Sequence, residues 1–267
     1  MAESQTILNL ADWLWEHRVP EARREEAYNA VQPNHKALIK RGIQCAFTFF
    51  GCEPSQSLTQ ITDANAGLRR VSAAQPADWA LLLVDGEQSA AARLTAAAIL
   101  PRLAGVLDVA AVSIGSPPPN ASLVSLELAG IEDIFVLSEE EIGLLLRSRT
   151  GCGRICCLSH KAKLSCDGHP VLLTDRKPSL ALLSPNAFDR DTLACMHGFV
   201  PAQALSSDLP KHCDAVFADE PTCARLIEDS TIPIPLILSP GLEGFWLYPA
   251  RPVDFLLQKH AFFPTAQ

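Results

Sequence analysis

The sequence has few aromatic residues, no excess of basic residues and no unbroken apolar stretch of membrane-spanning length. Aromatic residues make up 6% of the 267 residues, and the formal net charge is -8. Phosphate binding needs clustered Lys and Arg, so this charge argues against nucleic acid as a partner. The most apolar long stretch, residues 95–114, is interrupted by Pro101, Arg102 and Asp108, whereas a membrane span needs about 20 mostly apolar residues. No membrane association is expected.

The sequence also lacks the marks of a secreted protein. The first 17 residues include Glu3, Asp12 and Glu16, and they have no basic segment followed by an apolar one, as a signal peptide would. The nine cysteines are an odd number, and their spacing outlines no disulfide framework. We therefore expect a cytoplasmic protein with reduced thiols.

What the sequence does contain is aliphatic: 48% of its residues are hydrophobic, and a chain of this length can bury a large core. Short apolar runs that end at turn residues are typical of strands covered on both faces. Such runs predict strands at residues 79–84, 106–114, 134–137, 154–158, 171–174, 180–184, 215–218 and 235–239. Because helical patterns separate the first three at short spacing, the sequence predicts an α/β protein with doubly wound parallel sheets.

Helical patterns are expected through the first 70 or so residues, over residues 58–74, 89–103 and 120–129, and from Ser138 onward. Pro33 should interrupt the first of these, and Pro101 should kink or shorten another. Asn120 is the expected N-cap of its helix. Ser138 and Glu141 fit a capping box, and the carboxylates of residues 139–141 complement the helix dipole. The same carboxylates would oppose a dinucleotide phosphate, which needs a free helix N-terminus.

Several segments occur in an order that is found in a known family. In order along the chain, these are residues 80–87, 99–106 (ILPRLAGV), 117–120 (PPPN), 128–131 (LAGI) and 134–135. They resemble, in the same order, five segments of histidinol dehydrogenases: the strand and turn V-G-V-Y-V-P-G-G, the helix end I-P-A-x-x-A-G-V, a proline-rich turn, the helix end L-A-G-V/I and the strand I/V-F. Ile39–Gly42 is similar to the early I-x-x-R-G-D of that family. Three elements near the end of the sequence also look like those of the family. Tyr248-Pro249 is similar to its Y-x-P, Asp254-Phe255 to its G-D-Y, and His260 with Pro264-Thr265 to its N-H-x-L-P-T.

The resemblance implies the aldehyde-dehydrogenase-like type of fold, with two Rossmann-like parallel-sheet domains, one inserted in the other. Residues 78–178 would form the inserted domain. Residues 1–77 and 179–267 would form a helical N-terminal segment and the second α/β domain. Members of the family oxidise an amino alcohol to a carboxylate with NAD, use a bound zinc and form dimers.

The acid–base pair of that family is the Glu-His of an A-P-E-H-L-E motif, which corresponds here to Ile232–Ile237. Ile234 stands at the glutamate position and Pro235 at the histidine position. Neither exchanges a proton, and such catalysis is worth about 10²–10⁴-fold per group. The alternative is a misplaced match over a plain core strand. However, the only Glu-His dipeptide, Glu16-His17, lacks the flanking motif.

The cofactor and zinc segments are also altered. The family's I-G-G-A-Q-A-I loop corresponds to Leu137–Ile142, and its P-G-G turn is reduced to residues 85–87 (DGE). Of the zinc ligands, His197 and Asp254 match, Ala194 replaces a glutamine, and the sequence stops before the arm that supplies the last histidine. Two ligands cannot make the three-plus-water geometry of catalytic zinc. Two interpretations of His197 therefore remain: it binds a metal together with Asp254, or it is a buried or exposed histidine that binds no metal.

The other candidate for a redox or metal site consists of Cys152, Cys156, Cys157 and Cys166. Their spacing lacks the paired C-x₂-C units of structural zinc sites, and Cys156 and Cys157 would face opposite sides of a strand. Reduced, buried thiols are the interpretation we favour, with Cys152, flanked by glycines, the most exposed of them.

The sequence therefore predicts a histidinol-dehydrogenase-like protein that does not catalyse the histidinol reaction and acts by binding or association. No catalytic residue and no cofactor is expected. The expected partner is an unidentified small molecule or protein, and the sequence is compatible with an oligomer. One alternative is an NAD- and metal-dependent oxidoreductase with a rearranged site at His197, Asp254 and His260. The other is a redox or metal-binding protein that uses Cys152–Cys166.

Overall fold

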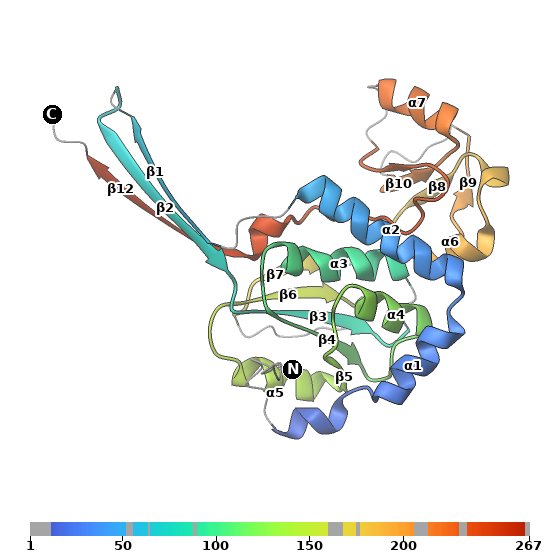
Figure 1. Ribbon diagram of the computed structural model, residues 1–267, viewed down its shortest axis with the longest axis horizontal. Coiled ribbons are helices and arrows are strands. Elements are labelled where there is room, and N and C mark those ends of the chain that lie inside the picture. The colour runs from blue at the N-terminus through green and yellow to red at the C-terminus, as the bar shows by residue number, and fades with distance from the viewer. Residues whose placement is uncertain are drawn as a thin grey trace, which may run out of the picture.

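The computed structural model describes residues 12–51, 56–63, 65–87, 90–159, 168–174, 177–205, 213–229 and 234–264. These residues form two parallel sheets with helices around them and a projecting three-stranded antiparallel sheet (Figure 1). The prediction of an α/β protein with Rossmann-like parallel sheets is confirmed. Among the helices so described, none is long and apolar enough to cross a membrane.

The elements follow one another in three groups. The N-terminal group consists of η1 (Asp12–His17), α1 (Glu21–Ala30), α2 (Pro33–Phe50), β1 (Ser57–Asp63) and β2 (Leu68–Pro76). The middle group consists of β3 (Trp79–Asp85), α3 (Ala91–Leu103), β4 (Asp108–Ile114), α4 (Asn120–Leu128), β5 (Ile134–Leu137), α5 (Glu139–Ser148), β6 (Gly153–Leu158) and β7 (Val171–Thr174). The last group consists of β8 (Leu180–Leu182), η2 (Pro185–Ala187), α6 (Arg190–His197), β9 (Ala202–Gln203), β10 (Ala215–Phe217), α7 (Glu220–Glu228), β11 (Ile237–Leu238), η4 (Pro252–Phe255) and β12 (Leu256–Pro264).

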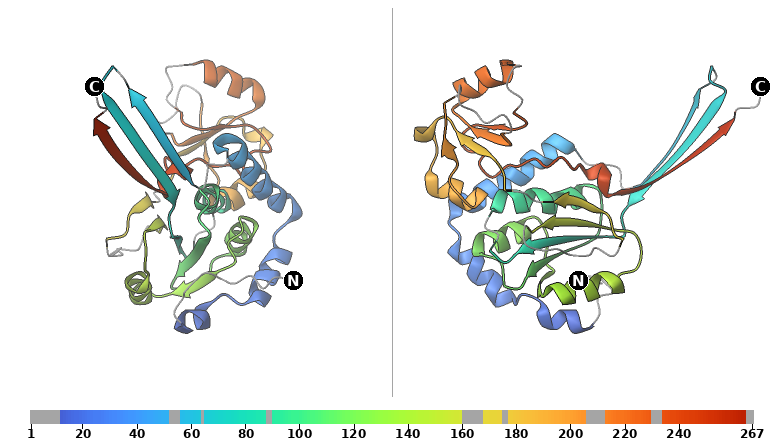
Figure 2. Two further views of the ribbon diagram at one scale, coloured as in Figure 1. Left: turned by 60° about the vertical axis from the view of Figure 1, so that its left-hand side comes forward. Right: turned by 180° about the vertical axis from the view of Figure 1, so that it is seen from behind.

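The first parallel sheet has the strand order β5-β4-β3-β6-β7, with two strands on each side of β3. Every residue of β3 is buried because helices cover both faces of the sheet. Helices α3 and α4 lie on one face and α5 lies on the other, as Figure 2 shows. The order reverses between β3 and β6, and the carboxyl ends of the strands at such a switch point are where Rossmann-like sheets bind ligands.

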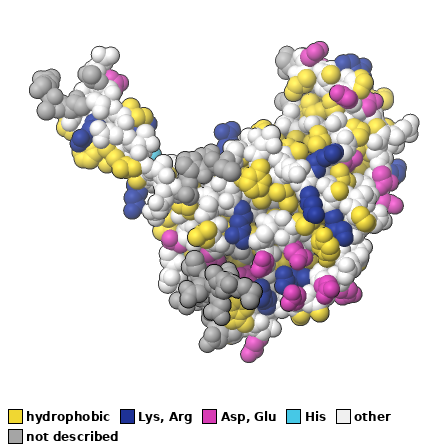
Figure 3. Space-filling model, in the orientation of Figure 1, with side chains coloured by type: hydrophobic (Ala, Val, Ile, Leu, Met, Phe, Trp, Pro, Cys, Tyr) yellow, Lys and Arg dark blue, Asp and Glu magenta, His cyan; other side chains and the backbone are white. Residues whose placement is uncertain are grey.

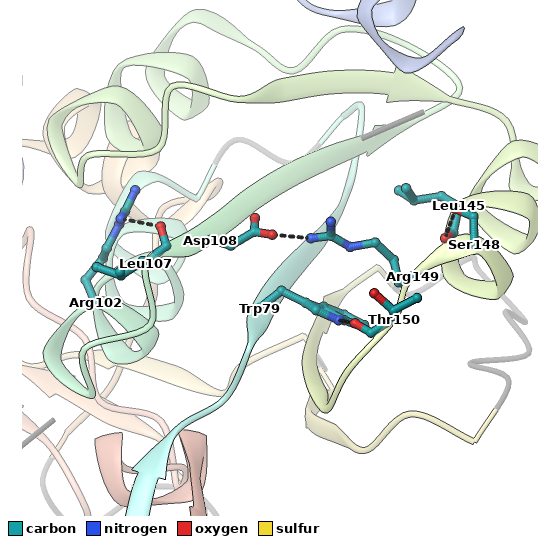
Figure 4. A network of polar contacts seen from close by, with 8 residues as sticks. All are labelled: Trp79, Arg102, Leu107, Asp108, Leu145, Ser148, Arg149 and Thr150. Atoms are coloured by element: carbon teal, nitrogen blue, oxygen red, sulfur yellow. Dashed lines mark hydrogen bonds and ion pairs between the residues drawn. The ribbon is translucent and has the colours of Figure 1, made fainter. Parts of the chain in front are cut away.

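A buried ion pair ties this sheet to α5 (Figure 4). Arg149, which follows α5, donates from Nη2 to Oδ2 of Asp108, at the start of β4, over 2.8 Å. The guanidinium also lies over the ring of Trp79, 5.0 Å from its centroid, and Trp79 Nε1 donates to the Thr150 carbonyl. Burial raises the pKa of Asp108, and Arg149 opposes that rise. The pair is therefore a buried charge pair rather than a solvated surface contact.

The second parallel sheet has the order β11-β10-β8-β9, and α6 and α7 belong to it. Its body is small, with Ala181, Val216 and Leu226 in one buried cluster. Helices α2 and α3 contact α6, which places this sheet against the helical face of the first one. The first sheet spans residues 79–174 and the second spans residues 180–238.

Two local predictions are wrong, and two are confirmed. Residues 58–74 form the β1–β2 hairpin rather than a helix, since β2 pairs along its length with β12 as well as with β1. Asn120 is the first residue of α4 rather than its N-cap, which is Pro119, and its Oδ1 accepts from Arg23 instead. Pro33 does interrupt the N-terminal helical segment, because α2 begins there. Helix α3 ends at Leu103, as predicted, and Pro101 lies within it.

Strands β1, β2 and β12 form an arm that extends away from the two parallel sheets (Figures 1 and 2). We call it the β-arm. Strand β2 is its centre, and β1 and β12 are its edges. Most of its residues are exposed, and the C-terminal strand was not predicted from the sequence.

Candidate ligand-binding site

A pocket of about 450 Å³ lies where the last turn of α2 meets the second sheet. The residues just before β8, β10 and β11 contribute one side of it, and the chain from Trp246 to Arg251 contributes the other. Its lining consists of Phe49, Phe50, Pro178, Asp214, Pro235, Trp246, Leu247, Tyr248, Pro249 and Arg251. A volume of several hundred cubic ångströms and a mostly apolar lining are typical of small-molecule sites.

Two pairs of aromatic rings form the walls. Phe49 and Phe50 meet edge to face, with centroids 4.9 Å apart, and Trp246 and Tyr248 do so at 6.3 Å. Helix α2 ends at Phe50, because Gly51 takes a positive φ of 69° there, so both phenyl rings lie at its C-terminal end. Phe49 is 63% exposed, which makes it the outer wall.

Three polar groups accompany these rings. Trp246 is only 7% exposed, yet its Nε1 has no hydrogen-bond partner among the described residues. Arg251 is exposed at the rim, and Asp214 is half-buried, with its Oδ2 accepting from the Ser179 backbone nitrogen at 2.8 Å. Trp246 Nε1 itself is closed off from the pocket, so the polar groups that a ligand can reach here are those of Arg251 and Asp214.

A contact between two glycines holds the inner wall in place. A Cβ on Gly42, in the middle of α2, would overlap the carbonyl oxygen of Gly244, and a Cβ on Gly244 would overlap that of Leu38. The backbone of α2 and that of the loop before Trp246 therefore touch directly. Arg41 adds a hydrogen bond from Nη1 to the Gly241 carbonyl at 3.1 Å.

A buried polar cluster lies behind Trp246. His197 is fully buried at the end of α6, with its ring centroid 5.0 Å from that of Phe217 and 6.1 Å from that of Trp246. Burial, and then the nearby Arg93, lower the pKa of His197 to about 3, while the backbone of Glu243 acts in the opposite direction. Neither ring nitrogen makes a hydrogen bond of good geometry with a described residue. This histidine is neutral and closed off from water, so it cannot exchange protons with a substrate.

The predicted metal ligands are not brought together. Asp254 is exposed on η4, where its Oδ2 accepts from the Arg251 backbone nitrogen at 2.7 Å. Figure 1 shows α6, which carries His197, and η4 at opposite ends of α3. His260 lies on the β-arm beside Ser72. Among the described residues, no group of three or more His, Cys, Asp or Glu could hold a metal ion. The described residues thus do not fit a zinc ion, and the metal site stays a prediction.

The two segments that the resemblance aligns with the cofactor-binding loops carry acidic side chains. Asp85, at the carboxyl end of β3, accepts from Ser159 Oγ at 2.5 Å across the switch point, next to the end of β6. The predicted capping box of α5 is confirmed, because the Ser138 hydroxyl accepts from the Glu141 nitrogen, and the Glu141 carboxylate accepts from Ser138. Hydrogen bonds from Ser138 hold the pKa of Glu141 below its usual range. Glu141 lies in the first turn of α5, with its Oε1 3.5 Å from His17 Nε2. A carboxylate at this helix N-terminus does not fit the pyrophosphate of NAD.

The cysteines do not form a shared site among the described residues. Cys152 is exposed, as expected. Cys156 and Cys157 lie on β6 and contact the cores on opposite faces of the sheet, which confirms their predicted orientation. Burial raises the pKa of the Cys156 thiol, which keeps it protonated. Cys166 lies outside the described residues.

One of the two positions that the resemblance aligns with the acid–base pair lies at this pocket. Pro235 lines the pocket, whereas Ile234 packs against the core of the second sheet. Both residues are identified in the sequence by what they replace, but no sequence pattern singles out Phe49, Trp246 or Arg251. The available signal was a glycine in the middle of a helix, Gly42, which often marks a close backbone contact.

No protein-family model matches the chain, and no curated protein matches it either. Among solved structures, a histidinol dehydrogenase from Elizabethkingia anophelis superimposes with a TM-score of 0.58 at 10% identity, covering 92% of this chain and 76% of that one. A succinate-semialdehyde dehydrogenase from Burkholderia pseudomallei is similar with a TM-score of 0.42 at 10% identity, covering 93% and 80%. A salicylaldehyde dehydrogenase from Pseudomonas putida G7 follows at 0.32 and 15%, covering 78% and 53%. The chain has the fold of a histidinol dehydrogenase.

Proposed function

We propose that this chain is a binding protein built on a dehydrogenase-type fold, and that it takes a small molecule in the pocket beside Trp246. One observation carries the proposal: the pocket is open and several hundred cubic ångströms in size, but Pro235 lines it where the resemblance places an acid–base histidine. A fold can be kept while its chemistry is replaced.

The neighbouring groups support binding without turnover. His197 is a neutral side chain in a closed core, and a general base must reach the proton that it removes. Asp214 is the carboxylate that lines the pocket, and its Oδ2 is already engaged by the Ser179 nitrogen. Phe49, Phe50 and Trp246 can bind a ligand, but none of the three can accept its proton.

Purified protein incubated with histidinol and NAD should produce no NADH. The physical reason is the absence of a proton acceptor at Pro235 and the acidic groups at Asp85 and Glu141, where a pyrophosphate would bind. NADH absorbance provides the readout, and thermal melting with and without NAD tests binding separately, because a ligand that binds the folded state raises Tm. NADH formation that requires histidinol would overturn the proposal.

The β-arm favours association with a second copy of this chain as an additional role. Paired residues of β1, β2 and β12 share a face. One face carries Leu58, Val71, Ala73, Ala261 and Phe263, together with the polar residues Gln60, Thr62, Arg69, Gln75 and Lys259. Leu58 is 77% exposed and Phe263 is 40% exposed, and Figure 3 shows hydrophobic side chains along this arm. A sheet of three strands normally needs a covered apolar face to be stable. A twofold pairing of two such faces would supply that cover.

Light scattering on the full chain should give twice the chain mass of 28.9 kDa at micromolar concentrations. The Leu58→Asp variant should lower the dimer affinity by at least about tenfold, because it replaces an exposed leucine of the contact face by a charge. Thr59→Asp is the matched control, since neighbouring strand residues face opposite sides. A wild-type monomer at these concentrations, or a Leu58→Asp variant that dimerises as well as Thr59→Asp, would contradict this role.

A further inference from the structure

The pocket beside Trp246 combines features that restrict the chemistry of its ligand. Its walls are ring faces and ring edges, from Phe49 and Phe50 on one side and Trp246 and Tyr248 on the other. Rings pack best against another flat ring system in offset or edge-to-face contact. The apolar body of the ligand is therefore aromatic, and a pocket of about 450 Å³ has room for two fused rings.

Trp246 contributes its ring to the pocket but not its nitrogen. The ring lines the pocket, and it meets Tyr248 edge to face on the same wall. The Nε1 atom is fully buried, so a ligand in the pocket does not reach it. The wall at Trp246 therefore selects for an aromatic surface and adds no hydrogen bond.

The charge at the rim comes from Arg251. Its guanidinium is exposed and makes no ion pair with a described residue, although its backbone nitrogen donates to Asp254. Asp214, which carries the opposite charge, is half-buried and accepts from the backbone nitrogen of Ser179. An arginine side chain that is free to reorient at a pocket mouth favours an anionic group on the ligand.

We propose that the ligand is an aromatic carboxylate, whose rings lie between Phe49 and Trp246 and whose charge is bound by Arg251. This rests on the proposed function, because it names the ligand of the same pocket. The ring of Trp246 packs against the rings of the ligand, and the guanidinium of Arg251 neutralises its charge. A cationic ligand of the same shape is disfavoured because it would meet Arg251.

Titration calorimetry with three probes of one shape tests the proposal: 2-naphthoate, 2-naphthamide and 2-naphthylmethylammonium. We expect affinity to fall in that order. Arg251→Gln should weaken 2-naphthoate about fivefold and leave 2-naphthamide unchanged. Trp246→Phe should weaken 2-naphthoate and 2-naphthamide by the same factor of about three, because it removes part of one ring wall. Phe49→Ala, at an exposed position, should weaken all three probes without affecting folding.

Arg190→Gln is the matched control, since Arg190 is exposed on α6 and does not line the pocket. Thermal melting of each variant separates a lost contact from a lost fold. Equal or tighter binding of the ammonium probe would overturn the aromatic carboxylate and leave a binding pocket standing. Binding of none of the probes would overturn the ligand class, whereas histidinol-dependent NADH formation would overturn the proposed function itself.

Discussion

Replacing Arg149 by Met should lower the free energy of unfolding by about 3–5 kcal/mol, because it leaves the Asp108 carboxylate buried without its partner. Both side chains are only 9% exposed, and they meet at 2.8 Å. Burial already raises the pKa of Asp108 even with the guanidinium in place. Methionine fills similar space beside Trp79, so the loss should come from the charge and not from a cavity. Urea denaturation at neutral pH measures it.

Two controls separate this effect from a general loss of packing. Arg147→Met, on the exposed side of α5, should change the free energy of unfolding by less than about 0.5 kcal/mol. The double variant Asp108→Asn and Arg149→Met should recover part of the loss, since no buried charge remains. A group whose pKa is raised in the folded state costs stability above that pKa and regains it on protonation. The deficit of Arg149→Met should therefore shrink as the pH is lowered through the raised pKa of Asp108, and a deficit that grows on acidification would contradict the explanation.

The parallel sheets could be predicted from the sequence because their strands are covered on both faces. Such strands appear as continuous apolar runs, and β3, β4 and β5 were found from them. The capping box at Ser138 was predicted for a similar reason, since it depends only on residues three apart. Local patterns decide such features, and no distant residue can change them easily.

The β-arm could not be predicted, because its structure depends on a distant strand. Ile61, Leu68 and Val71 recur at helical spacing, and this coincidence gave the wrong prediction of a helix. In the structure, Ser72 pairs with His260, which lies 188 residues away in the sequence. Strand preference is decided largely by the neighbours across the sheet, which a single sequence does not reveal.

The pocket could not be predicted from the sequence either, because it too depends on residues that are far apart in the chain. Its walls come from the end of α2, from residues before three strands of the second sheet, and from the chain around Trp246. The sequence showed which chemistry Ile234 and Pro235 cannot perform, but it could not show that Pro235 faces Phe49 and Trp246 across one cavity. Gly42 was the one local sign of this packing, since a glycine in mid-helix normally costs stability.

For that reason Gly42→Ala should destabilise the protein by about 2 kcal/mol, although alanine is the better helix former. An added Cβ would overlap the Gly244 carbonyl oxygen, and that neighbour is backbone, which cannot rotate away. Trp246 follows Gly244 by two residues, so a displaced loop also moves the inner wall of the pocket. The variant should lose 2-naphthoate affinity by about tenfold or more, because the aromatic contacts of the ligand depend on that wall.

Gly143→Ala in α5 is the matched control, because the nearest atoms to its added Cβ are the tip of the Arg147 side chain, at 3.4 Å. There the helix propensity of alanine should act alone and stabilise the protein by about 0.5–1 kcal/mol. Opposite signs for the same substitution in two helices can only come from what each glycine touches. Urea denaturation of the two variants gives this comparison, and a Gly42→Ala protein as stable as Gly143→Ala would show that α2 and the loop before Trp246 are not in contact. The aromatic walls would then not face one another, and the pocket would lose its physical basis.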